Sequence, residues 1–109
     1  MEIVKFDEFK KLDIRSAIIL EASEHPNADK LYVLKIDLGT ETRQIVAGIR
    51  AYYTKEELIG KHIVVVTNLE PRAIRGVDSN GMLLAVHDES GAVYVLNSER
   101  AVKAGSPVS

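Results

Sequence analysis

Residues 54–67 read TKEELIGKHIVVVT, and this stretch decides the fold. Thr54 can cap a helical turn, and Glu57, three residues later, can return the hydrogen bond as in a capping box. Gly60 is suited to ending that turn. The run from His62 to Thr67 is short and rich in valine, which favours a buried strand over a helix. The stretch therefore predicts one short helix directly before a core strand.

Segments on both sides of this stretch also have the pattern of strands, because they are apolar and rich in β-branched residues. Turn residues separate them, for example HPNAD at 25–29, GTET at 39–42 and DESG at 88–91. The long polar segment 68–80 is predicted to be a loop, and Asp7 is a possible cap for a single turn in the opening segment 4–12. The predicted strands are 14–22, 31–38, 43–47, 62–67 and 82–86, with a further short strand over 92–96.

Five strands with one short helix before the fourth and a C-terminal strand extension predict an all-β fold, the five-stranded Greek-key OB-fold barrel. An immunoglobulin-like sandwich fits less well, since it needs about seven strands. The 109 residues are predicted to form a single domain over residues 1–109. OB barrels bind ligands across strands two and three, between the first loop and the loop after strand four. Here those loops are 25–30 and 68–80, and both carry basic residues.

Composition excludes several classes of function. The chain has no cysteine, so it has neither disulfides nor a thiolate metal site, and its three histidines are dispersed. No nucleophile elbow, P-loop or paired-carboxylate motif is present, so we predict a non-catalytic protein without cofactor or metal. The charged opening segment is no signal peptide, and no apolar run approaches the roughly 18 residues of a membrane span. A soluble, cytoplasmic protein is expected.

The charge of the chain is unevenly distributed. The formal net charge is −2, which counts against indiscriminate binding of nucleic acids. Residues 41–75 nevertheless carry six basic and four acidic residues, whereas acidic residues dominate before and after them. The pattern fits an oriented contact with an anionic partner, and it also fits random scatter.

Several motifs in order resemble one family. They are DIR at 13–15, HPNADKLY at 25–32, RQIVAGI at 43–49, ELIGK at 57–61, NLEPR at 68–72 and RGVDSNGM at 75–82. Together they resemble the tRNA-binding domain that is appended to methionyl-tRNA synthetases and that also occurs in free-standing structure-specific tRNA-binding proteins and in the human endothelial-monocyte-activating polypeptide. The resemblance covers about residues 6–96. One departure is AIIL at 17–20, where a basic residue is frequent in the family.

The resemblance implies an OB fold that binds the outside corner of tRNA by shape more than by sequence. It also implies a homodimer formed through the C-terminal strands, and a methionyl-tRNA synthetase as a possible partner. Two alternatives stay open: a secretion-type chaperone of the same fold family that binds peptides, and a docking scaffold that has lost RNA binding.

The predicted tRNA-binding residues combine family position with side-chain chemistry. Lysine and arginine can bind phosphate, and an arginine fork can also stack on an unpaired base. A hydroxyl can bond a ribose or phosphate, and a thioether offers a polarisable surface to a base. Each residue also has a purely structural interpretation, such as pairing with a nearby acid, loop fixation or core packing. The predicted residues are Lys30, Arg43, Asn68, Arg72, Arg75, Ser79 and Met82.

Overall fold

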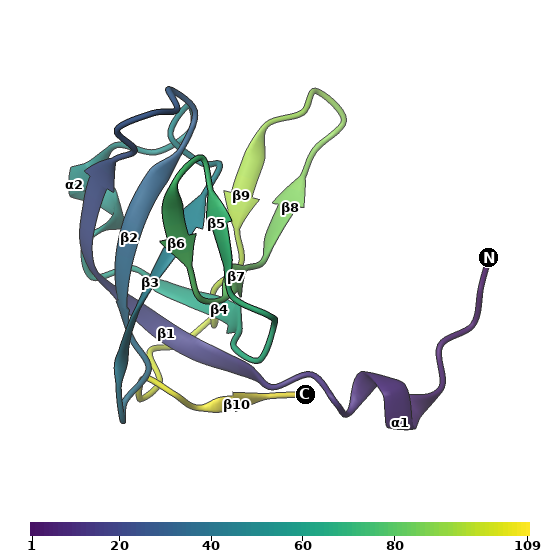
Figure 1. Ribbon diagram of the computed structural model, residues 1–109. Coiled ribbons are helices and arrows are strands. Elements are labelled where there is room, and N and C mark those ends of the chain that lie inside the picture. Colours follow the sequence, from purple (N-terminus) through teal and green to yellow (C-terminus); the bar gives the residue numbers. More distant parts are fainter.

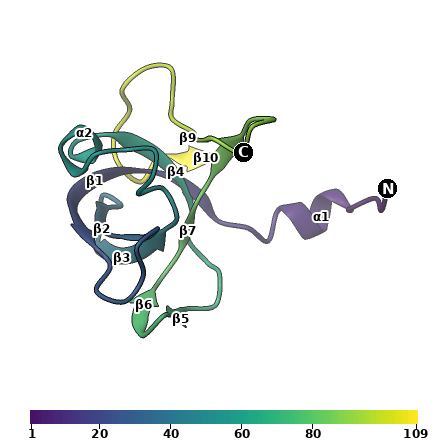
Figure 2. The ribbon, with the colours of Figure 1, turned by 90° about the horizontal axis from the view of Figure 1, so that it is seen from above.

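Five strands form a curled sheet in the order β3-β2-β1-β4-β7 in the computed structural model, which describes residues 1–109 (Figure 1). All neighbouring strands are antiparallel. Seen from above, the sheet curls into a ring (Figure 2). The ring closes where the Asn80 amide donates to the Gln44 carbonyl over 2.9 Å. The predicted OB-type barrel is confirmed. Its strands are β1 Ile14–Glu24, β2 Tyr32–Asp37, β3 Thr42–Ala47, β4 His62–Val66 and β7 Met82–Leu83.

The interior of the barrel follows from alternation along the strands. In β2, Tyr32, Leu34 and Ile36 point inward and are buried, because successive side chains face opposite sides of a sheet. The short helix α2 (Lys55–Leu58) lies against β1 and buries Leu58 completely. Its predicted capping box is confirmed: the Glu57 amide donates to Thr54 Oγ1, and the Thr54 amide donates to the Glu57 carboxylate.

The segment 72–79 forms a β-hairpin, and its prediction as loop was wrong. Strand β5 (Arg72–Ile74) pairs with β6 (Val77–Ser79) through a two-residue turn. Both turn residues have positive φ, 53° for Arg75 and 87° for Gly76. Positive φ at both positions is the type I′ geometry that matches the twist of a hairpin, and it is usually signalled by Asn-Gly or Asp-Gly. Arg-Gly is a weaker signal, so the sequence did not reveal the hairpin.

The predicted strand 82–86 is divided at Leu84. Strand β7 ends at Leu83, and β8 (Ala85–His87) pairs instead with β9 (Val93–Val95), forming a ribbon that projects from the barrel (Figure 1). The Leu84 amide donates to Val64 in the barrel, and the Leu84 carbonyl accepts from Leu96 in the ribbon. Leu84 therefore marks where the chain passes from one sheet to the other.

The C-terminal end of the chain lies at the start of β1 (Figure 1). Strand β10 (Pro107–Val108) pairs with Ile14 and Arg15, an element that the sequence did not predict. Gly105 precedes it with φ 85°, and a Cβ there would meet the Leu38 carbonyl oxygen at 2.2 Å. Only glycine permits this close approach.

The opening residues form an arm that projects from the barrel (Figure 2). Its helix α1 (Phe6–Phe9) begins after Lys5, so Asp7 lies inside the first turn and is not its cap. The Glu8 carboxylate accepts from the Lys5 amide instead. No helix of the structure is long and apolar enough to cross a membrane.

Candidate nucleic-acid interface

The first loop and the tip of the β5–β6 hairpin are joined by reciprocal hydrogen bonds. The Asn27 side chain donates to the Arg75 carbonyl, and Arg75 Nη2 donates to the Asn27 carbonyl, each over 3.2 Å. Between them lies the buried ring of His25, which accepts from the Asn27 amide at Nδ1 and bonds the Ile74 carbonyl from Nε2 over 2.8 Å. Since a carbonyl only accepts, Nε2 carries the proton. The two loops that flank the ligand face of an OB barrel are thus held as one unit.

Three of the six cations of the basic zone 41–75 pair with carboxylates of the chain. Arg43 pairs with Glu41, whereas Arg50 and Lys55 both pair with Glu24. Lys61 lies over the Tyr53 ring. The two remaining cations make no ion pair, and both belong to the hairpin: Arg72 and Arg75.

Four of the seven predicted site residues are exposed and lie on the first loop, on the hairpin or beside it. Lys30 lies in the first loop, Arg72 and Arg75 lie on the hairpin, and Met82 begins β7 beside it. The nearby acids Glu70 and Asp78 form no ion pair with either arginine. The structural interpretation of these arginines, in which each pairs with a neighbouring acid, is therefore not observed. Here we call Lys30, Arg72, Arg75 and Met82 the hairpin face.

Ser79 is buried and serves the fold. Its hydroxyl accepts from the Val46 amide over 2.9 Å and donates to the Gly81 carbonyl over 3.2 Å. A hydroxyl engaged in this way fixes the end of the hairpin against β3. Its direct contact with RNA stays a prediction, and in this structure the side chain has almost no free surface to make it.

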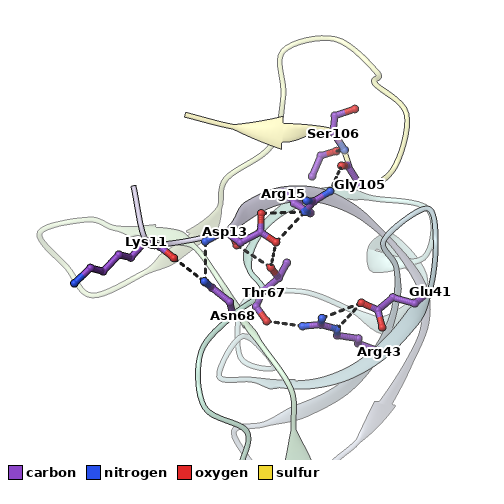
Figure 3. Close-up of polar contacts among 10 residues, drawn as sticks. Lys11, Asp13, Arg15, Glu41, Arg43, Thr67, Asn68, Gly105 and Ser106 are labelled. Carbon is purple, nitrogen blue, oxygen red and sulfur yellow. Dashed lines mark hydrogen bonds and ion pairs between the residues drawn. The ribbon is translucent and has the colours of Figure 1, made fainter. Parts of the chain in front are cut away.

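Arg43 and Asn68 belong to a second polar cluster, which also contains Asp13 and Thr67 (Figure 3). Asn68 accepts from the Asp13 amide and donates to the Lys11 carbonyl. Arg43, whose side chain is only 19% exposed, donates to the Thr67 carbonyl as well as to Glu41. Both side chains are thus engaged by the fold itself, and Asn68 braces the base of the arm.

Asp13 lies at the centre of this cluster. Its carboxylate accepts from the Thr67 hydroxyl over 2.7 Å and from Arg15 Nε over 2.9 Å. The Thr67 hydrogen bond, followed by that of Arg15, lowers the pKa of Asp13 below its ordinary value of 3.8. Ionised Asp13 therefore connects the base of the arm to β4 and to β1.

We expect Asp13→Asn to lower stability at neutral pH by no more than about 1 kcal/mol, because the carboxylate is partly exposed and screened. A carboxyl group whose folded-state pKa is lowered stabilises the fold above its ordinary pKa and loses that effect as pH falls through the folded pKa. The difference between wild type and variant should therefore vanish in acid below the folded-state pKa. Urea unfolding across pH measures it, and a difference independent of pH would contradict this assignment.

The sequence did not point to His25 and Asn27 as parts of this site. His25 stands apart from the other two histidines in sequence, and its burial and hydrogen bonds give it a structural role. The HPN turn was the available signal, since Asn side chains commonly bond nearby backbone. The structure contains no group of three or more His, Cys, Asp or Glu residues that could hold a metal ion.

Comparisons with known proteins agree with this geometry. A family described as "putative tRNA binding domain" matches residues 14–107. The chain is 53% identical over 108 residues to a methionine–tRNA ligase of Thermococcus kodakarensis, covering 99% of this chain and 14% of that protein. The chain therefore spans only a small part of such relatives.

Two solved structures resemble the chain along nearly its whole length. One is a MetRS related protein from Pyrococcus horikoshii, with a TM-score of 0.92, 37% identity and 99% of each chain covered. The other is the chaperone CsaA of Bacillus anthracis, with a TM-score of 0.90, 31% identity, and coverage of 99% of this chain and 100% of that one.

Proposed function

Since this chain belongs to the family of putative tRNA binding domains, we propose that it binds folded tRNA through the hairpin face. In this proposal Lys30, Arg72 and Arg75 bind phosphates, and Met82 supplies an apolar contact. Ser79 fixes the end of the hairpin against β3, and Asn68 and Arg43 hold the segments around Asp13 and Thr67. Phosphate contacts set the position and orientation of the RNA.

One observation carries the proposal. Of the six cations in residues 41–75, three pair with carboxylates and Lys61 lies over the Tyr53 ring, whereas the two on the hairpin have neither a carboxylate nor an aromatic partner. An unpaired guanidinium can release counterions from RNA on binding, whereas a cation already paired with a carboxylate gains less. Within this zone, the arginines without a carboxylate partner therefore both lie on the hairpin.

The distribution of aromatic residues favours a folded RNA over a single strand. Proteins that bind single strands stack bases on exposed aromatic platforms. Here Phe6 and Phe9 lie in the arm, Tyr32 is buried, and the Tyr52 and Tyr53 hydroxyls bond the β8–β9 ribbon and its turn. The hairpin face has no aromatic residue, so contacts to backbone and shape would dominate there.

The test is a titration of unfractionated tRNA at two salt concentrations, with an unstructured RNA of equal length as control. We expect binding of folded tRNA that weakens steeply with salt, and much weaker binding of the control. Absence of tRNA binding at low salt would contradict the proposal.

The proposed partner arrangement is a homodimer. Apolar side chains on the arm (Ile3, Val4 and Phe6) and on the ribbon (Val86 and Tyr94) are exposed. Strand β9 pairs on one side only, and an exposed apolar edge of this kind is commonly paired or covered. A second copy would cover it and place two hairpin faces on one assembly. A monomeric mass by light scattering across the micromolar range would contradict the dimer.

A synthetase is the second proposed partner, because the chain is similar to part of methionine–tRNA ligases. The whole chain would then act as one non-catalytic tRNA-binding unit, without cofactor, in the cytoplasm. It would raise the local concentration of tRNA for the enzyme. Aminoacylation rates measured with and without added chain would test this role.

Peptide binding is the alternative, and the likeness to a solved chaperone structure favours it. An apolar cleft of about 350 Å³ between β3, β7 and the ribbon offers a place for it. Binding driven by apolar burial should persist at high salt, whereas RNA binding should not. Titration of an unfolded peptide at the same two salt concentrations separates the two functions.

A further inference from the structure

A second cleft, of about 510 Å³, lies between the β5–β6 hairpin and β7. Its lining combines an apolar wall that includes Leu69 and Met82 with two charged residues, Glu70 and Arg72. Small-molecule sites have this size and composition, mostly apolar with a few placed polar groups. The cleft is large enough for one flat ring system with its attached groups.

The backbone of this apolar wall is fixed to the barrel, but its side chains are accessible. Met82 is 46% exposed and Leu69 is 37% exposed, although Val66, the register partner of Met82 in β4, is buried. The backbone of Met82 is thus fixed while its side chain stays accessible. A thioether is polarisable and makes favourable contacts with aromatic rings.

The two charged residues beside this wall favour a ligand that has a hydrogen-bond donor at one end and a negative charge at the other. Glu70 and Arg72 form no ion pair with each other or with any other residue. A bare phosphate would be attracted by Arg72 and repelled by Glu70. A nucleotide satisfies both, because its phosphate suits a guanidinium and the amino group of adenine, guanine or cytosine donates to a carboxylate.

We infer that this cleft holds one unpaired, amino-bearing nucleobase of the bound RNA. The base lies against Met82 and Leu69, its amino group donates to Glu70, and its phosphate binds Arg72. Bases splayed out of loops and bulges are the usual targets of sequence-dependent RNA recognition. The inference rests on the proposed binding of tRNA and adds one base-reading contact to recognition by shape.

The test uses the two methionines of the chain, Met1 and Met82, as internal probe and control. Protein labelled with ¹³C at the methionine methyls is titrated with unfractionated tRNA, while fluorescence anisotropy records binding in parallel. A base stacked on Met82 should move its methyl signal upfield through the ring current. The Met1 signal, from the arm, should not show this upfield shift.

Two variants give independent outcomes. Met82→Ala should weaken tRNA binding about tenfold, the loss expected from one stacking contact, whereas Ile59→Ala, at an exposed apolar residue after α2, should change it little. Glu70→Ala removes a negative charge, so electrostatics alone would tighten binding. A carboxylate that accepts from the base predicts the opposite, binding several-fold weaker at high salt.

The failure of this inference differs from that of the proposed function. Binding of tRNA without an upfield shift of Met82 would overturn the base site and leave tRNA binding intact. Binding that tightens in Glu70→Ala would overturn the role of the carboxylate. A Met82 signal moved by an unfolded peptide but not by tRNA would assign Met82 to peptide binding and overturn the base site, and no binding of tRNA would remove both proposals.

Discussion

Replacing Arg72 and Arg75 together with glutamine should weaken tRNA binding by at least roughly 30-fold. A hydrogen bond to a charged group contributes about 1.5 to 3 kcal/mol, and surface screening reduces this for exposed arginines. Each 1.4 kcal/mol is about tenfold in affinity. The slope of log affinity against log salt should also fall by about two, because two phosphate contacts are lost.

The matched control is the double variant Arg50→Gln and Lys55→Gln, which removes the same charge from the same basic zone. Those two cations already pair with Glu24, so their loss should change affinity far less. Equal losses in the two double variants would show that general charge, and not the hairpin, attracts the RNA. An unchanged salt slope in the hairpin variant would likewise contradict phosphate contact by these arginines.

Replacing His25 with alanine should lower the free energy of unfolding by about 2 to 4 kcal/mol. The ring is buried and bonds both the Asn27 amide and the Ile74 carbonyl. Its removal leaves a cavity and two partly buried groups unpaired, and a fully buried unpaired group costs about 1 to 3 kcal/mol. Urea unfolding measures the change in stability. Binding of tRNA should weaken as well, at temperatures where the variant is still folded, because the first loop and the hairpin lose their common anchor.

The exposed His87 supplies the control, since His87→Ala removes the same side chain without removing a buried contact. It should change stability by less than about 0.5 kcal/mol. If folded His25→Ala bound tRNA as tightly as wild type, the joint between loop and hairpin would be irrelevant to binding. That result would leave His25 with a role in stability alone.

The elements that the sequence predicted well are those whose signal is local. The Thr54–Glu57 capping box and the strand predicted over 31–38 each depend on residues close together in sequence, and both are found, the strand as Tyr32–Asp37. The elements missed depend on distant partners. Strand β10 is two residues long and forms only because Gly105 and Ser106 bond Ser16 across the fold.

The candidate site likewise combines features that are local in sequence with features that depend on distant residues. Exposed cations can be identified in a sequence, but whether each is neutralised depends on the fold. Arg43 and Arg72 have the same side chain, and only the structure shows that Arg43 is occupied by Glu41 and Thr67 while Arg72 is unpaired. Burial is equally non-local: Ser79 lies in a polar segment, yet its hydroxyl bonds β3 and the turn after β6.

The most direct test of tRNA binding through the hairpin face is to map backbone amide chemical shifts by NMR as folded tRNA is added. We predict that the perturbed amides cluster in residues 25–31 and 69–82, and that the perturbations decrease as salt is added. Perturbations confined to the β8–β9 ribbon and the adjoining apolar cleft, with the hairpin unchanged, would contradict it.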